Sequence, residues 1–267
     1  MESILKQAQK VAEAAEVFMV SSEETPVRFE ANRLKHIQHK QSTSVALRIV
    51  KQGRIGYALT TEMDDSQSLV NNAVEVADFG MSAKFELPSL ISYPEVEVFD
   101  PEVEPVTTEE MVSLGEELIA TIRGHTPDIV CEAGVTKSVI SVQMVNSQGG
   151  QANYWKSIFT LGIVGSLIRG TDMLFVGEIE SSCHPLPQSK AVAEAVIQQL
   201  ELAKNRASAP SKPLPVIFTP RGVASALISP LMAAFNGKTV LEGASPIGNK
   251  LGQQVFDNKL WLWDDPT

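Results

Sequence analysis

The chain has 267 residues, of which 43% are hydrophobic and 20% are charged, and its formal net charge at pH 7 is −10. This composition is typical of a soluble globular protein with room for two medium-sized domains or three small ones, and it argues against intrinsic disorder. The acidic balance, with no cluster of Lys and Arg, argues against a nucleic-acid partner because phosphates are neutralised by clustered cations.

The two cysteines and the apolar runs indicate the compartment. Cys131 and Cys183 lie far apart with no CxxC spacing, which is typical of a protein in a reducing cytosol. No apolar run approaches the ~20 residues that span a membrane. Lys, Gln and Glu interrupt the apolar residues of 1–20, so this segment is not a secretory signal. We therefore expect a cytoplasmic protein with no membrane segment.

The first part of the chain reads as a helix, a set of strands and a second helix. An apolar stripe predicts a helix over residues 2–16. Strand-like runs follow at 17–22, 27–32, 34–40, 43–51 and 54–61, and the break around Gly53 predicts a hairpin turn. Asp65-Ser66 supplies candidate N-caps for a second helix that ends at Gly80.

The same order then repeats. Residues 91–105 are rich in Pro, Asp and Glu and predict a solvated, extended connector. Thr107 and Glu110 have the spacing of a capping box, for a helix that ends at Gly124. Strand-like runs are then found at 128–135, 138–146, 152–168 and 171–180, with a turn at 147–150, and a helix is expected at 189–206.

These patterns predict an α+β fold built from two helix–antiparallel meander–helix units, residues 1–90 and 106–206. A linker at 207–215 leads into residues 216–267, which we interpret as the incomplete start of a β-rich third domain. That segment is expected to contain a strand at 216–219 and a helix at 226–238 that stops at Asn236-Gly237. It is too small to bury a core of its own.

Several short motifs suggest chemistry, and each has a simpler interpretation. GASPIGNKLG (243–252) lacks the Lys directly after the second glycine that a phosphate-binding loop needs, since Asn249 intervenes and Leu251 replaces Ser or Thr. His36 and His39 lie in a strand-like run and face opposite sides. His125 follows a helix-ending glycine and is expected to interact with that helix terminus.

Cys183-His184 and three acidic pairs are the other candidates. A thiol beside an imidazole suggests a nucleophile, but sequence neighbours seldom align for proton transfer. Glu109-Glu110 and Glu116-Glu117 diverge on a helix and are expected on a solvated face, and Asp264-Asp265 is the third pair. Read residue by residue, the chain contains no catalytic constellation.

Three stretches carry a family resemblance. TSVALRIVKQGRIGYALTT (43–61), NSQGG (146–150) and LISPLMAAFNGKTVLEGASPIGNKLGQQVFDNKLWLWDDP (227–266) resemble, in order, the first, middle and third domains of the TldD/PmbA family. The last stretch is the most specific and is similar to the PmbA (TldE) branch. The family is metallopeptidase-related, and its older label is modulator of DNA gyrase.

The resemblance implies that this chain is not the zinc-bearing subunit. In the TldD branch a helix bears His-Glu-x-x-x-His, which supplies two zinc ligands and the general base. The histidine positions fall here on Ile228 and Ala233 and the glutamate position on Ser229, and none of these side chains binds zinc. The family's third ligand, a cysteine, comes from sequence beyond Thr267, so the chain is expected to be a C-terminally incomplete form.

The implied function is that of a TldE/PmbA-like subunit which pairs with a TldD-like, zinc-bearing partner and acts on unfolded peptides in the cytosol. No catalytic, metal-binding or cofactor-binding residue is then expected in this chain, and its substrate-binding residues stay unknown. Exposed strand edges are expected to receive extended peptide, and a two-fold dimer is expected. Two alternatives stay open: a non-proteolytic binding or regulatory module that resembles a gyrase modulator, and a hydrolase that uses Cys183.

Overall fold

The computed structural model describes residues 1–89, 93–205, 207–208 and 210–263, in two compact units, 1–205 and 206–267. No helix in these described ranges is long and apolar enough to cross a membrane. In chain order the first unit contains α1 (Glu2–Ala8), β1 (Ala14–Glu30), β2 (Arg33–Ile37), β3 (Lys40–Lys51), β4 (Arg54–Thr60), α2 (Ser66–Ala77), η1 (Pro101–Val103), α3 (Thr108–His125), β5 (Val130–Asn146), β6 (Gln151–Arg169), β7 (Asp172–Ser182) and α4 (Lys190–Leu202).

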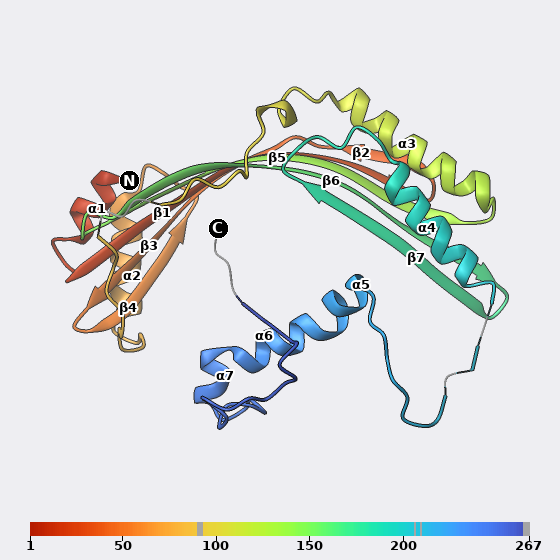
Figure 1. Ribbon diagram of the computed structural model, residues 1–267. Coiled ribbons are helices and arrows are strands. Elements are labelled where there is room, and N and C mark those ends of the chain that lie inside the picture. Colours follow the sequence, from red (N-terminus) through yellow and green to blue (C-terminus); the bar gives the residue numbers. More distant parts are fainter. Residues whose placement is uncertain (90–92, 206, 209, 264–267) are drawn as a thin grey trace. The chain divides into compact units, whose positions relative to one another are not determined.

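The predicted α+β class is confirmed, and the first unit is built on one antiparallel sheet. The strand order is β4-β3-β1-β5-β6-β7, with β2 paired to β1. The pairing between β1 and β5 runs without a shift from Glu16 opposite Asn146 to Phe29 opposite Ala133. Strands expected in two units, 1–90 and 106–206, therefore lie side by side in one arched sheet (Figure 1). The domain boundaries themselves stay a prediction.

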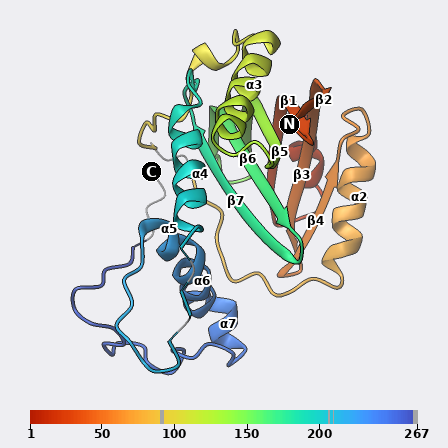
Figure 2. The same ribbon diagram turned by 90° about the vertical axis from the view of Figure 1, so that its right-hand side faces the viewer.

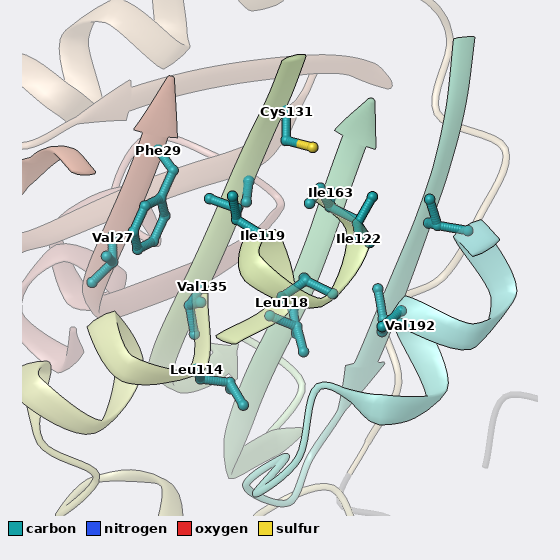
Figure 3. Close-up of a cluster of buried hydrophobic side chains, with 14 of the residues drawn as sticks. Val27, Phe29, Leu114, Leu118, Ile119, Ile122, Cys131, Val135, Ile163 and Val192 are labelled. Carbon is teal, nitrogen blue, oxygen red and sulfur yellow. The ribbon is translucent and has the colours of Figure 1, made fainter. Parts of the chain in front are cut away.

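Two hydrophobic cores lie on the same face of this sheet. Residues of odd number in β1 point to one face, and they include Val17 in one core and Val27 in the other. Helices α1 and α2 cover the first core, and α3 and α4 cover the second, where Phe29, Leu118 and Ile163 pack together (Figure 3). The opposite face carries exposed apolar side chains of β6 and β7: Val164, Ile168, Met173, Phe175 and Ile179.

The strands are longer than the sequence suggested. The runs at 17–22 and 27–32 merge into β1, and those at 128–135 and 138–146 merge into β5. Pro26 has no backbone N–H and cannot donate to a neighbouring strand. On one side of β1, the pairing with β3 ends at Glu24 and the pairing with β2 begins at Val27, so Pro26 lies between the two. A proline at that junction interrupts neither ladder on this side of the strand.

The helix predicted over residues 2–16 is wrong in its second half. Helix α1 ends at Ala8, and β1 begins at Ala14. Residues 14–16 are paired to β3, and β5 joins from Glu16, so hydrogen bonds to two neighbouring strands override the helical spacing of the alanines. Ala15 is fully buried in the strand conformation.

The local start and turn signals are confirmed. Asp65 accepts a hydrogen bond from the Ser68 N–H and caps α2. Thr107 and Glu110 form the expected reciprocal capping box at α3. The β3–β4 hairpin turns at Gln52-Gly53, where both residues have positive φ. Such signals depend only on residues a few positions apart, so they can be read from the sequence.

The acidic connector is not solvated throughout. Residues 90–92 lie outside the described part, but Val103 in η1 is fully buried in the second core. Phe99 packs against Trp155 of β6 with ring centroids 6.2 Å apart, and the Ser157 N–H donates to the Val98 carbonyl at 3.0 Å. The second half of the connector therefore docks on β6 and is part of the first unit.

The second unit contains α5 (Pro220–Val223), the π-helix η2 (Ala224–Ile228), α6 (Ser229–Phe235) and α7 (Gly237–Leu241). The expected strand at 216–219 is wrong, since the described residues of this unit contain no strand. Asn236 ends α6 as predicted, but its side chain also caps the next helix, α7. None of the residues described in this unit is buried, so a core for it is not formed within these residues.

Gly56 is where α2 approaches β4 most closely, and it gives the first prediction. A Cβ at Gly56 would lie 2.0 Å from the Ala73 carbonyl oxygen in α2, so Gly56→Ala must push the helix away from the sheet. We expect a loss of about 1–3 kcal/mol in the free energy of unfolding, measured with urea. Gly124→Ala in α3 is the control, because nothing lies within 4 Å of a Cβ there. Equal effects of the two changes would contradict this account.

Candidate functional site

The three positions that the family resemblance assigns to the zinc helix lie in the second unit. Ile228 ends η2, and Ser229 and Ala233 belong to α6. All three residues are exposed. Thr219 starts the helical segment by accepting a hydrogen bond from the Gly222 N–H at 3.1 Å. These three side chains include no imidazole, thiolate or carboxylate, which are the groups that usually bind zinc.

Pro230 explains why this helix is irregular. A proline inside a helix lacks the N–H for the bond to the residue four positions earlier, and its ring collides with that residue's carbonyl group. Here the turn before it, from Ala224 to Ile228, is widened into a π-helix, and α6 starts with Pro230 in its first turn. The sequence therefore produces two joined helical pieces where a single regular helix was expected.

The glycine-rich stretch 243–252 is a series of turns. It follows α7, which ends at Leu241, whereas a phosphate-binding loop connects a strand to a helix. Ser245 Oγ donates to the Ala234 carbonyl at 2.7 Å, and Gly243 and Gly252 have positive φ. The stretch is a folded return of the chain onto α6, with none of the strand–loop–helix context of a nucleotide site.

Cys183 and His184 have separate structural partners. The His184 Nδ1 lies 2.8 Å from Asp100 Oδ2, and the Cys183 Sγ donates to the Glu97 carbonyl at 3.9 Å. Ser157, almost fully buried, donates to the Cys183 carbonyl at 2.6 Å and accepts from the Asp100 N–H at 2.8 Å. These contacts fasten the connector to β6 and to the end of β7, and they direct the thiol and the imidazole to different groups.

Asp100 makes structural contacts that the sequence did not indicate. Its carboxylate accepts from the Glu102 N–H at 2.8 Å and also binds His184. The first of these hydrogen bonds, and then the second, lower the pKa of the Asp100 carboxyl below its usual value of 3.8. Nothing in the local sequence marks this pairing, because Asp100 and His184 are 84 positions apart.

The other candidates take part in structure. His36 lies opposite Arg28 in the β1–β2 pair, while His39 contacts Thr25 Oγ1 at 3.2 Å and Glu23 at 3.4 Å. His125, the last residue of α3, contacts Glu201 of α4 at 2.6 Å. Within the described ranges no three His, Cys, Asp or Glu residues are placed to hold a metal ion.

Residues of the first two acidic pairs also make structural contacts. Glu110 belongs to the capping box of α3, and Glu117 accepts a hydrogen bond from Ser189 Oγ at 3.0 Å. The Glu110 pKa is lowered by its hydrogen bonds to Thr107. Asp264-Asp265 lies outside the described residues.

The NSQGG turn at 146–150 joins three parts of the first unit. Asn146 Oδ1 accepts from the N–H groups of Gln148 and Gly150, each at 2.9 Å, and Asn146 Nδ2 donates to the Pro88 carbonyl at 2.8 Å. Ser147 exchanges hydrogen bonds with the backbone of Ala15. The motif therefore holds the β5–β6 turn, the start of β1 and the residues before the connector in one arrangement.

A polar crevice of about 290 Å³ lies on the helix-bearing face of the sheet, between the two cores. Its lining residues are Ser21, Ser22, Glu23, Thr25, Gln41, Glu104, Lys137, Ser138, Val139, Ser141 and Trp155. The ammonium group of Lys137 donates to the carbonyl groups of Glu104 and Val106, the latter at 2.7 Å. The crevice thus offers hydroxyl groups and carboxylates, and its lysine is already bound to the connector.

Two family models match this chain. The PmbA/TldA metallopeptidase domain 1 matches residues 15–77, and the PmbA/TldA metallopeptidase C-terminal domain matches residues 211–267. An uncharacterized protein of Methanocaldococcus jannaschii (MJ0231) is 26% identical over 276 residues, which cover 100% of this chain and 62% of that protein.

Solved structures show the same fold. TldE from Thermococcus kodakarensis has a TM-score of 0.77 and 17% identity, over 94% of this chain and 58% of its own. Candidate modulators of DNA gyrase from Thermotoga maritima and Bacteroides thetaiotaomicron have TM-scores of 0.77 and 0.80, identities of 17% and 15%, and cover 95% of this chain. The chain spans 59% and 60% of these two proteins, so it corresponds to well under two thirds of each relative's length.

The Asp100 contacts give the second prediction. Because the folded-state pKa of Asp100 is lowered, its stabilisation is present above about pH 3.8 and is lost as the pH falls through the folded-state pKa. Asp100→Asn should therefore reduce the dependence of stability on pH in this acid range. It should also speed amide hydrogen exchange in residues 96–103 at neutral pH. Glu102→Gln, an exposed change in the same connector, is the control, and equal exchange rates in both variants would contradict the assignment.

The two thiols give the third prediction. Cys131 is completely buried, and burial raises the pKa of its thiol to about 11, whereas Cys183 is partly exposed. An alkylating reagent at pH 8 should therefore modify Cys183 alone in the folded protein, and both thiols after unfolding, because the thiolate is the reactive form. Mass spectrometry of the labelled chain measures this. Fast native labelling that persists in Cys183→Ala would show that Cys131 is accessible.

Proposed function

Because two PmbA/TldA metallopeptidase family models match this chain, we propose that it is a TldE/PmbA-like subunit of a cytosolic metallopeptidase system that acts on unfolded peptides. In this proposal the catalytic zinc is carried by a TldD-like partner. The observation that carries it is the occupancy of the zinc-helix positions by Ile228, Ser229 and Ala233, since aliphatic and hydroxyl side chains do not replace two imidazoles and a general base.

The contacts of Cys183 and His184 support the proposal that catalysis takes place on the partner subunit. Hydrolysis of a peptide bond by a thiol needs an imidazole within hydrogen-bond reach of the sulfur. The Cys183 thiol and the His184 imidazole instead bind two different groups of the connector, Glu97 and Asp100. A subunit of this kind contributes surfaces to the assembly, and the reaction takes place on the partner's metal.

The alternative is a regulatory module without a proteolytic role. Two of the structural relatives are described as candidate modulators of DNA gyrase, which is the observation that favours it. The net charge of −10 argues against direct contact with DNA, so such a module would bind protein. The two proposals differ in whether a zinc-bearing family member binds this chain.

Reconstitution separates these proposals and gives the fourth prediction. The chain should be co-expressed with an HExxxH-bearing family member from the same genome. We expect the two to co-elute, with zinc in proportion to the partner alone, and to cleave an unfolded peptide that neither cleaves at the same rate by itself. Zinc is measured by elemental analysis and cleavage by mass spectrometry.

Two controls make the result specific. Replacing the glutamate of the partner's HExxxH motif with glutamine should abolish cleavage while the complex still forms, because that residue is the general base. Cys183→Ala in this chain should leave the cleavage rate unchanged. Stoichiometric zinc in the isolated chain together with cleavage by that chain would refute the proposal, and the absence of any complex would favour the regulatory module.

A further inference from the structure

The helices that cover the sheet leave a gap between them, and β1 fills this gap with polar side chains. Helices α3 and α4 lie over β5, β6 and β7, whereas α2 lies beside β4 (Figure 2). On the helix-bearing face of β1, Val17 belongs to one core and Val27 to the other, and Ser21, Glu23 and Thr25 lie between them. These three residues line the polar crevice of about 290 Å³.

The register of the sheet places the other lining groups of this crevice. On β5, Val139 lies opposite Glu23, and Ser141 lies opposite Ser21. Trp155 of β6 continues this row, since it lies opposite Ser141. Directly opposed residues of paired strands share a face, so Val139 forms an apolar floor that hydroxyl groups, a carboxylate and an indole ring surround.

Two carboxylates of the lining have oxygens that are free to accept hydrogen bonds. Glu23 contacts His39 at 3.4 Å through Oε1 alone. The Glu104 carboxylate, which the connector contributes, has no ion pair in the part of the chain that the structure describes. Lys137, the cation among the described lining residues, donates to the backbone carbonyl groups of Glu104 and Val106. A further cation in the crevice can therefore be bound by these carboxylates.

Trp155 adds a flat aromatic surface beside the carboxylates. The residue is 57% exposed, and its ring meets that of Phe99 at a tilt of 51° with the centroids 6.2 Å apart. This contact orients the indole and leaves much of its surface uncovered. An indole face attracts cations, and a guanidinium group suits it better than an ammonium group because it is planar and more weakly hydrated.

These groups select the ligand by size and by charge. A volume of about 290 Å³ is at the low end for small-molecule sites, so the crevice has room for a side chain but not for a nucleotide cofactor. An anion would meet two carboxylates and a lysine that is already bound. A guanidinium group has five N–H donors in one plane, which match carboxylate and hydroxyl oxygens while its face stacks on an aromatic ring.

We propose that this crevice binds the guanidinium group of an arginine in an extended peptide. Glu23 and Glu104 accept its N–H groups, and Trp155 stacks on its face. Gln41 and Ser141, which also line the crevice, offer donors and acceptors to the neighbouring peptide groups. The guanidinium site stands on these lining residues, whereas the peptide as its carrier rests on the proposed function.

Titration of the full chain with short peptides tests this site and is the fifth prediction. The probe is acetyl-Gly-Arg-Gly-amide, and its counterpart contains citrulline, which keeps the shape of arginine without the charge. In a background of Trp261→Phe and Trp263→Phe, Trp155 is the sole indole, so its fluorescence reports on the crevice. The arginine peptide should change the emission in a saturable way, and the citrulline peptide should bind about tenfold more weakly or less. Added salt should weaken the binding because it screens exposed charges.

Matched variants locate the site. Glu23→Gln and Glu104→Gln should each weaken binding of the arginine peptide by about threefold to tenfold, measured by calorimetry. Glu24→Gln is the control for the first change, because neighbouring residues of a strand face opposite sides of the sheet. Glu102→Gln, in the connector but outside the lining, is the control for the second. Both controls should leave the dissociation constant unchanged, and melting temperatures close to wild type would show that each variant is folded.

Three results would overturn the guanidinium site: no saturable binding, equal binding of the arginine and citrulline peptides, or equal losses in the variants and their controls. Acetyl-arginine-amide, which lacks the flanking glycines, tests the carrier. It should bind more weakly than the peptide, and equal affinity would refute the peptide as the carrier while supporting the guanidinium site. These titrations contain neither zinc, peptidase partner nor cleavage, so their failure and a failed reconstitution are separate results.

Discussion

The pairing of β1 with β5 is the interaction on which the rest of the first unit depends. It runs from Glu16 to Phe29 on one strand and from Ala133 to Asn146 on the other. Strands β2, β3 and β6 pair directly with one of these two, and the outer strands β4 and β7 follow on β3 and β6. Because the pairing has no bulge, the side-chain alternation of β1 stays in phase along its length. Both hydrophobic cores therefore form on one face of the sheet, and the opposite face takes part in neither core.

The elements that could be predicted are those set by neighbouring residues. The caps at Asp65 and Thr107 and the turn at Gly53 depend on groups within a few positions, and the structure contains all three. The β1–β5 pairing depends on residues more than a hundred positions apart, and no local pattern encodes it. The same reason explains the error at residues 14–16, where alanines with helical spacing lie in a strand because β3, and from Glu16 also β5, pairs with them.

At the candidate site, too, residue identities could be read from the sequence, whereas contacts between distant residues could not. The identities of Ile228, Ser229 and Ala233 can be read directly from the chain, and they argue against a metal at those positions wherever the helix lies. The partners of Cys183 and His184 could not be read, because Asp100 and Ser157 reach them only after the connector has crossed to β6. Adjacent thiol and imidazole groups suggested a reaction, whereas the fold uses both to hold a crossing segment.

The contacts at the two outer strands show which edges of the sheet are open to a further strand. Gln199 hydrogen-bonds both backbone groups of Gly177, although leaving them to solvent would cost little stability. The Gln199 contact therefore serves to keep a further strand from pairing with β7 at Gly177. At β4 the cover by Met81 stops at Ile55 and leaves Tyr57 and Leu59 exposed. Among the described residues, Tyr57 and Leu59 of β4 thus have no further strand paired beside them.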